Sequence, residues 1–395
     1  METINICRFI GETFPSFEKI DSGLAPNYYN LSAELAKLGI ETTIVCPSAK
    51  NQPYFEEANG FKVCRFDSPG GKIAELGFNF PLNKAGMKKI SSLEKDVLQL
   101  HNFYGYWIQK WVEEPNVLTV HGCDVEIYNN VPLWPVEMPY KHFKSWWDIK
   151  RTLMLSRRMC RRATRIVGVA EAVTNEIREN FGVKNAETIY NGIDSKIFFR
   201  RKENPFAKNS KTFNILFVGR ITPLKGLEYL FDAIDGLENA KLFVACDMNK
   251  AEEKYLKILL RKVKHPQKII FLGKVPNKEL PKYYSGADCT VLPSLAEGFP
   301  KVIIEAMACG CPVITTNVSG NPEIVTEKTG FLVEPKNSAK LKEAIVEIMQ
   351  NPVEAKKRAR NAAEIAAEKF TWRNSAEKYA SLYKKILETN SKQSD

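Results

Sequence analysis

Two glutamates, Glu297 and Glu305, lie eight positions apart in the segment EGFPKVIIE. The segment follows CTVLP (289–293), which is typical of a buried strand, and Pro300 suits the first turn of a helix because its missing N–H would be unpaired there. We therefore expect Glu297 in a loop and Glu305 inside the helix. Between them lies a helix N-terminus, whose N–H groups and positive dipole end can bind phosphate. A ligand with a central diphosphate and a sugar on each side would match this pattern.

A second pattern is FVGRITPLKG (217–226), in which a strand ends at Gly219 and is followed by Arg220 and Lys225. Arginine can bind phosphate oxygens with two parallel N–H groups, and lysine acts as a point charge. Both cations would offset the charge of a leaving diphosphate. The alternative is that Arg220 and Lys225 are merely exposed on a loop. For the pair of glutamates, the alternative is that two surface residues flank a helix start by chance. The position at the carboxyl end of a strand favours a ligand site.

The elements that must position these residues alternate between strands and helices. Strand patterns in the first half are 4–10, 42–47, 97–101, 117–121 and 165–169, with helices at 25–38 and 170–180. Strand patterns in the second half are 213–219, 241–246, 268–273, 289–293 and 312–316. This rhythm predicts an α/β protein with two doubly wound, Rossmann-like domains facing a cleft.

The predicted boundaries follow a change in composition. We expect an N-terminal domain at 1–195, a charged linker at 196–211 and a C-terminal domain at 212–370. Residues 371–395 are expected to form a helix that crosses back to the N-terminal domain, followed by a disordered tail.

Composition points to a soluble globular protein. Hydrophobic residues make up 44% of the 395 residues, and no apolar run is long enough to span a membrane. The N-terminus lacks the pattern of a secretory signal, and the nine cysteines form no C-x-x-C motif. A reduced cytoplasmic location is therefore expected.

The net charge of +11 lies wholly in residues 196–395, since residues 1–195 are balanced. A basic half can indicate a nucleic acid or a phosphorylated ligand. Many of its lysines, among them Lys250, Lys254, Lys257 and Lys262, fit exposed helix faces instead. No aromatic and basic RNA-binding pattern accompanies them, so no nucleic acid partner is expected.

Taken together, the motifs resemble a known family. FVGR-x4-KG, EGFPKVIIEAMACGCPVITTNVSGNPEIV and GFLVEP resemble the retaining GT-B glycosyltransferases of family four, the relatives of glycogen and sucrose synthases. HGCD (121–124), YNGID (190–194) and the C-terminal TW helix extend the resemblance over nearly the whole chain.

The resemblance implies a role for each matching residue. Arg220 and Lys225 would hold the diphosphate of a nucleotide sugar, Glu305 the ribose hydroxyls, and Glu297 would lie against the transferred sugar. The implied donor-binding set is Gly219, Arg220, Lys225, Glu297, Gly298, Phe299, Pro300, Lys301, Val302 and Glu305. Transfer would retain the anomeric configuration through same-face attack, with leaving-group stabilisation carrying much of the rate.

Other residues are expected around the donor and acceptor. His121 would lie near the donor sugar, although a histidine at a strand end is often only a core residue. His101 and Asp124 are expected on the acceptor side. Loop contacts are expected from Ser22, Gly23, Asn191 and Gly320. The family usually has paired glycines where this chain has Ser22-Gly23, and serine tolerates positive φ less well.

The sequence leaves the substrates open. GDP-mannose, UDP-glucose and UDP-N-acetylglucosamine all fit as donors, and a glycan or lipid-linked acceptor of cell-surface polysaccharide or glycolipid synthesis is expected. No D-x-D motif occurs, so we expect no required metal or other cofactor. A sugar-nucleotide epimerase of the same fold and a non-catalytic sugar-nucleotide binder are the alternatives. Glu297→Ala would separate catalysis from binding.

A basic amphipathic segment at 141–165 holds nine Lys and Arg residues, one Asp, and interleaved apolar residues that include Trp146 and Trp147. This pattern is typical of binding to a membrane surface. A helix packed on its own domain with solvated arginines explains it equally well. A membrane contact would place the protein at the inner face of the membrane and favour a lipid-linked acceptor.

Overall fold

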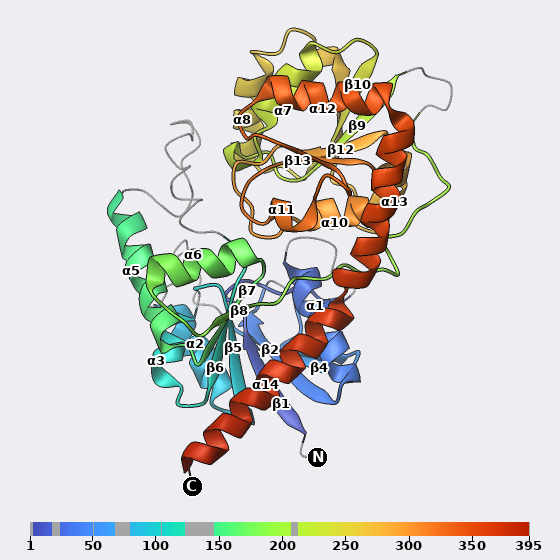
Figure 1. Cartoon of the computed structure of the whole chain (residues 1–395). Helices are drawn as coiled ribbons and strands as arrows, with labels where there is room; N and C mark the ends of the chain where they lie inside the picture. The colour runs from blue at the N-terminus through green and yellow to red at the C-terminus, as the bar shows by residue number, and fades with distance from the viewer. Residues whose placement is uncertain are drawn as a thin grey trace. The chain divides into compact units, whose positions relative to one another are not determined.

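The computed structural model describes residues 3–17, 24–49, 51–67, 80–103, 105–122, 146–206 and 212–394. These residues divide into two compact units, and each has its own sheet (Figure 1). The first unit takes the described residues up to 122, those from 146 to 192 and those from 372 onward. The second takes those from 193 to 371.

The first unit contains an eight-stranded sheet in the order β3-β4-β2-β1-β5-β6-β7-β8, parallel except for the β3–β4 pair. Its strands are β1 (Ile4–Phe9), β2 (Ile40–Pro47), β3 (Phe55–Ala58), β4 (Phe61–Phe66), β5 (Val97–His101), β6 (Asn116–Val120), β7 (Arg165–Gly168) and β8 (Ala186–Thr188). Every residue of β5 and β6 is buried, as expected of parallel strands covered on both faces. The strand order reverses between β1 and β5.

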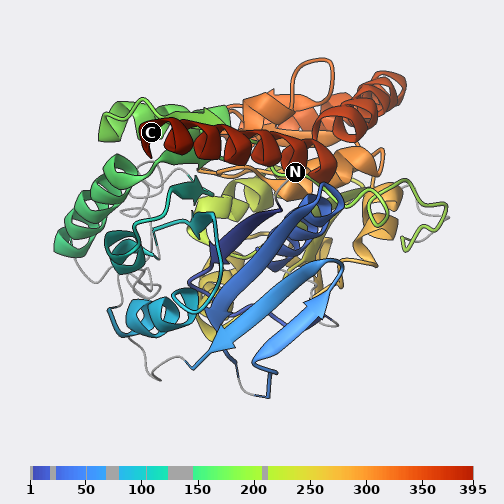
Figure 2. The same cartoon turned by 90° about the horizontal axis from the view of Figure 1, so that it is seen from below.

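Helices cover both faces of this sheet. They are α1 (Ala25–Lys37), α2 (Phe80–Ile90), α3 (Tyr106–Trp111), α5 (Trp146–Arg162), α6 (Glu171–Phe181) and α14 (Trp372–Ser394). The C-terminal helix α14 lies on the same face as α1 (Figures 1 and 2). Its Tyr379 and Tyr383 belong to one buried cluster with Ile6 of β1 and Leu31 of α1. The last helix of the chain is therefore part of the first unit.

The second unit contains a fully parallel six-stranded sheet in the order β11-β10-β9-β12-β13-β14. Its strands are β9 (Phe213–Val218), β10 (Ala240–Ala245), β11 (Ile269–Gly273), β12 (Cys289–Leu292), β13 (Val313–Thr316) and β14 (Phe331–Val333). Its helices are η4 (Pro223–Lys225), α7 (Leu227–Asp235), α8 (Lys250–Leu260), η5 (Pro266–Lys268), α9 (Leu280–Gly286), α10 (Lys301–Ala308), α11 (Asn321–Ile324), α12 (Ser338–Gln350) and α13 (Pro352–Lys369). Here the order reverses between β9 and β12.

The predicted fold class, two doubly wound α/β domains, is confirmed. The segment expected as a linker behaves differently up to residue 206. Phe198 and Phe206 are buried, and the ring of Phe206 packs against Phe243 at a centroid distance of 4.5 Å. Ile193 N–H donates to the carbonyl of Phe370 at 3.0 Å, so the second unit begins at this bond. These apolar side chains attach the segment to the second unit.

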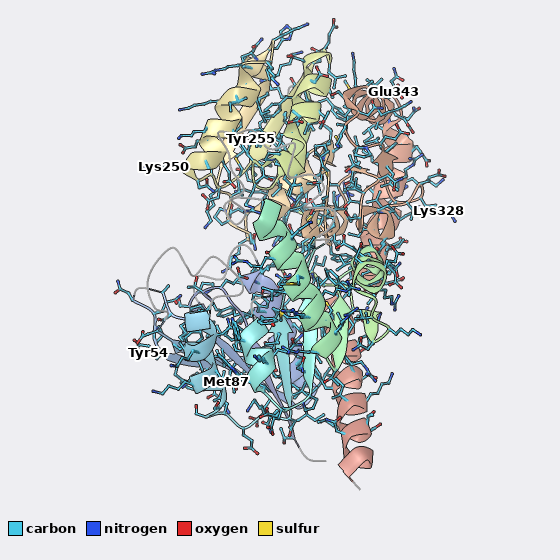
Figure 3. All side chains as sticks on the ribbon, turned by 90° about the vertical axis from the view of Figure 1, so that its left-hand side faces the viewer. Tyr54, Met87, Lys250, Tyr255, Lys328 and Glu343 are labelled. Carbon is cyan, nitrogen blue, oxygen red and sulfur yellow. The ribbon has the colours of Figure 1, made fainter. Side chains whose placement is uncertain are left out.

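The lysines of the second half lie where the helix pattern predicted. Lys250, Lys254 and Lys257 are exposed along α8, and Lys262 is exposed just beyond it. Figure 3 shows Lys250 at one end of this helix, with Tyr255 on the same helix. Tyr255 is buried and donates to Glu228 of α7 at 2.8 Å. Much of the positive charge of this half is therefore a solvated surface.

Candidate active site

The predicted ligand residues of the second unit gather where its strand order reverses. The loop after β9 carries Gly219 and Arg220 and leads into η4, which ends at Lys225. The loop after the neighbouring strand β12 carries Glu297. In doubly wound sheets, ligands bind outside the carboxyl ends of the strands at such a reversal.

The carboxylate of Glu297 is held by two side chains. Its Oε1 accepts hydrogen bonds from Lys225 Nζ and from Ser294 Oγ, the latter at 2.6 Å. The side chains of Glu297 and Lys225 are only 11% and 22% exposed. A half-buried ion pair is screened less than a surface pair. The structure thus brings together a cation and a carboxylate from sequence positions far apart.

Gly226 allows the two loops to approach this closely. Its φ is 60°, and a Cβ at this position would lie 2.1 Å from the carbonyl oxygen of Pro293. Next to it, Leu295 N–H donates to the carbonyl of Leu224 at 2.7 Å. Lys225 lies between these two contacts along the chain. Glycine is therefore required at 226, both by the backbone conformation and by the space.

A third loop, after β13, contacts the backbone of Glu297 and of its neighbours. The backbone N–H of Glu297 donates to Ser319 Oγ at 3.1 Å, and Ser319 itself has a positive φ of 43°. Thr316 Oγ1 donates to the carbonyl of Ser294 at 2.5 Å. Asn321 Nδ2 donates to Thr315 Oγ1 and to the Thr316 carbonyl, both at 2.9 Å. The loops after β12 and β13 are therefore tied together around Glu297.

Helix α10 starts next to this loop. Pro300 is its N-cap, so the helix begins at Lys301, one residue later than the sequence pattern predicted. Glu305 is 7% exposed and accepts a hydrogen bond from Tyr284 Oη at 3.1 Å. Burial raises the pKa of Glu305, and Lys301 one turn earlier opposes this shift. Burial lowers the pKa of Lys301.

The remaining donor-side residues have varied surroundings. Arg220 is exposed, and Gly219 has a φ of 152°. Phe299 is buried and packs against Phe370, with ring centroids 5.5 Å apart. Pro300 is buried as well, whereas Gly298, Val302 and Gly320 are half-buried or buried around the same loops.

In the first unit, both expected histidines lie at the carboxyl ends of neighbouring strands. His101 is the last residue of β5, and His121 comes directly after β6. His101 Nδ1 lies 3.0 Å from His121 Nε2, and His101 Nε2 lies 3.1 Å from Arg8 Nη2. His101 is 1% exposed. The ring of His101 therefore lies between the ring of His121 and the buried guanidinium of Arg8.

Three expected residues, Ser22, Gly23 and Asp124, lie outside the described residues. Asn191 is half-buried in the segment that leads into the second unit. Within the described ranges, no three His, Cys, Asp or Glu side chains gather as a metal site would require. In the same ranges, every helix is too short or too polar to cross a bilayer.

Sequence reasoning assigned no role to four residues that now stand at these sites: Arg8, Tyr284, Ser294 and Ser319. Arg8 had a signal, because a charge inside the apolar strand INICRFI is unusual. The two serines had none. Ser294 contacts Glu297 through the conformation of their shared loop, and Ser319 contacts it from the loop after the next strand, 22 residues further along the chain.

Comparison with known proteins identifies the family of this chain. Residues 198–366 match the family described as glycosyl transferases group 1, and residues 22–196 match glycosyltransferase family 4. An uncharacterised glycosyltransferase of Methanocaldococcus jannaschii is 30% identical over 306 residues, which cover 75% of this chain and 78% of the relative. The chain belongs to the group 1 glycosyltransferases.

Two solved structures show the same fold as this glycosyltransferase. Sucrose-phosphate synthase from Thermosynechococcus elongatus has a TM-score of 0.85 at 21% identity, with 98% of this chain and 100% of that chain covered. HepE of Anabaena, solved in complex with UDP and glucose, has a TM-score of 0.71 at 19% identity, with 97% and 100% covered. The predicted GT-B fold is thereby confirmed, and family membership sets the epimerase alternative aside.

Proposed function

We propose that this glycosyltransferase moves a hexose from a nucleoside diphosphate sugar to a glycan or lipid-linked acceptor, with retention of configuration and without a required metal ion. The observation that carries the proposal is the half-buried pair of Glu297 and Lys225 at the strand-order reversal of the second unit. The UDP and glucose complex of the structurally similar Anabaena protein supports a donor of this class.

Four charged residues of the second unit, Arg220, Lys225, Glu297 and Glu305, divide the donor between them. Lys225 and Arg220 bind the diphosphate and offset its charge as it leaves, which replaces a cation in this role. Glu297 contacts the transferred sugar, next to the bond that breaks. Glu305 accepts hydrogen bonds from the ribose hydroxyls. The start of α10 contributes N–H groups and its dipole to the phosphates.

Retention follows if the acceptor attacks the face from which the diphosphate leaves. The leaving group is then the base nearest to the acceptor hydroxyl, so a separate catalytic base is not required. Stabilisation of that leaving diphosphate by Lys225 and Arg220 supplies much of the rate. His121 of the first unit contacts the transferred sugar during the reaction.

A screen of donors tests this assignment. UDP, GDP and ADP sugars are added separately, and the melting temperature is measured with Mg²⁺ and with EDTA. We expect one base class to raise the melting temperature, since a ligand at 100 times its Kd stabilises by about 2.7 kcal/mol. The shift should be equal with EDTA. A shift without any sugar transfer would favour the non-catalytic binder instead.

Lys225→Met provides the matched arm of that screen. Loss of a charged contact to the diphosphate should weaken binding of the nucleoside diphosphate roughly 10- to 100-fold. Lys328→Met, which removes an exposed lysine from the same unit (Figure 3), should leave binding unchanged. Equal affinity of the Lys225 variant and the parent would contradict the assignment of Lys225.

Helix α5 supplies the contact with a lipid-linked acceptor. Its described exposed residues are Lys150, Arg151, Met154, Arg157, Arg158, Arg161 and Arg162, spaced so that they share one face. Met154 is 46% exposed within this basic face. Met159 and Cys160 are buried on the opposite side. We assign this face to the anionic surface of a membrane, at whose inner side the protein acts.

Charge removal on α5 tests this contact. The triple substitution Arg157→Gln, Arg158→Gln and Arg161→Gln should weaken binding to phosphatidylglycerol vesicles about 100-fold, at about 1 kcal/mol per cation. Lys254→Gln, Lys257→Gln and Lys262→Gln remove the same charge from the second unit and should change little. Flotation assays compare the two variants. Equal losses would show that net charge alone, and not α5, drives binding.

A further inference from the structure

Arg8 is a buried cation in the middle of the first sheet. It is 1% exposed, and its Nη1 donates to the carbonyl of Tyr28 at 2.9 Å and to Ser32 Oγ at 2.6 Å. Its Nη2 faces His101. In the part of the chain that the structure describes, no carboxylate lies within ion-pair distance of it. The guanidinium therefore donates its hydrogen bonds to neutral groups of α1 and to one histidine.

This contact fixes where the proton of His101 lies. A guanidinium can only donate, so Nε2 of His101 must accept from Arg8. A neutral imidazole has one donor and one acceptor nitrogen, so the proton of His101 is on Nδ1. Burial, and then the charge of Arg8, lower the pKa of His101 well below its usual value. His101 is thus a neutral ring with a known tautomer.

The same argument extends to His121. Nδ1–H of His101 faces His121 Nε2 at 3.0 Å, so this nitrogen of His121 must accept. The proton of a neutral His121 is then on Nδ1. A doubly protonated His121 would turn an N–H toward the N–H of His101. The chain of contacts therefore disfavours the imidazolium form of His121.

Tyr28 and two tyrosines of α14 lie near this chain of contacts. The ring of Tyr28 meets His101 edge-on at 4.7 Å and His121 at 6.1 Å. Its hydroxyl donates to Glu12 at 3.1 Å, and burial raises the pKa of that carboxyl. On α14, Tyr379 and Tyr383 bond Thr119 and Gln99, at 3.2 and 2.9 Å.

The backbone of His121 is fixed as well, because its N–H donates to Asn102 Oδ1 at 2.9 Å. We propose that Arg8 is a positioning residue, which acts through His101 to hold His121 as a neutral ring with its proton on Nδ1. This inference rests on the proposed function, in which His121 contacts the transferred sugar. His121 then serves as a hydrogen-bond donor to a sugar oxygen and not as a base.

Imidazole nitrogen NMR tests the proposal on the full chain without substrate. The chain has four histidines, so the variants His142→Gln and His265→Gln leave only the two rings in question once combined. At pH 7.5, we expect both rings to carry their proton on Nδ1, although an isolated histidine side chain prefers Nε2. A proton on Nε2 of either ring would refute the proposal that Arg8 positions His121 through His101.

Arg8→Met removes the N–H donor that fixes the tautomer of His101. We expect at least one ring to change to the Nε2–H form and the pH profile of kcat to acquire a histidine titration. Arg65→Met removes an equally buried arginine of β4, which binds the carbonyls of Phe14 and Pro53 and the carboxylate of Glu56. That control should lower stability without changing either tautomer. Unchanged tautomers in Arg8→Met would refute the proposal.

The NMR result and the transferase assay can fail separately. If both rings carry their proton on Nδ1 but the protein transfers no sugar, the positioning role of Arg8 is supported and the proposed function is contradicted. Sugar transfer by a protein whose His121 carries its proton on Nε2 would support the proposed function and refute the positioning role of Arg8.

Discussion

Glu297→Gln is expected to lower the rate of sugar transfer by roughly 10²- to 10³-fold, the loss typical of removing one preorganised polar group at a reacting centre. Glutamine keeps the size of the side chain but carries no charge. Lys225, which pairs with this carboxylate, then lacks its counterion. Binding of the nucleoside diphosphate should therefore be retained or tightened, because Lys225 is left to bind phosphate alone.

The measurement combines kcat for the donor found in the screen with calorimetric titration of the nucleoside diphosphate. Glu327→Gln is the matched control, since Glu327 is exposed in the same unit. It should change neither quantity. Normal transfer by the Glu297 variant would remove Glu297 from the reacting centre. If the Glu297 variant loses both diphosphate binding and sugar transfer, the loop after β12 has lost its structure.

Most strands of both sheets could be predicted because parallel strands are buried on both faces and read as apolar runs. VLQLH of β5 is one such run, and its every residue is buried. The β3–β4 pair was missed, since FEEA of β3 is half-exposed and carries two charges. Its turn had a signal in Asn59-Gly60, and both residues have positive φ, 53° and 78°. An edge hairpin is thus found from its turn more readily than from its strands.

The site could be predicted only as far as strand ends determine it. Lys225 and Glu297 follow neighbouring parallel strands, so their meeting follows from the sheet order. Ser319 could not be found this way, because its contact depends on a loop with a positive φ at a residue other than glycine. Arg8 could be recognised as unusual, but its partner His101 lies 93 positions away on another strand.

Gly226→Ala is expected to remove most transferase activity and to lower stability more than an ordinary glycine substitution. The left-handed conformation alone costs a residue with a Cβ about 1–2 kcal/mol. The new methyl group would also lie 2.1 Å from the Pro293 carbonyl oxygen, so η4 must move away from the loop after β12. This clash adds about 1–3 kcal/mol. Movement of Lys225 by about 1 Å from Glu297 can cost about 10²-fold in rate.

Gly273→Ala separates the two causes. Gly273 has a similar positive φ of 69°, but its added Cβ would meet nothing within 4 Å. It should therefore show the conformational cost alone, a fall in melting temperature of about 2–4 °C per kcal/mol for a domain of this size. Its transfer rate should stay normal. Because Leu295 N–H binds the carbonyl of Leu224 beside Gly226, only Gly226→Ala should break this bond and separate the cation from the carboxylate. Equal effects of the two substitutions on transfer would mean that close contact between the two loops is not needed for activity.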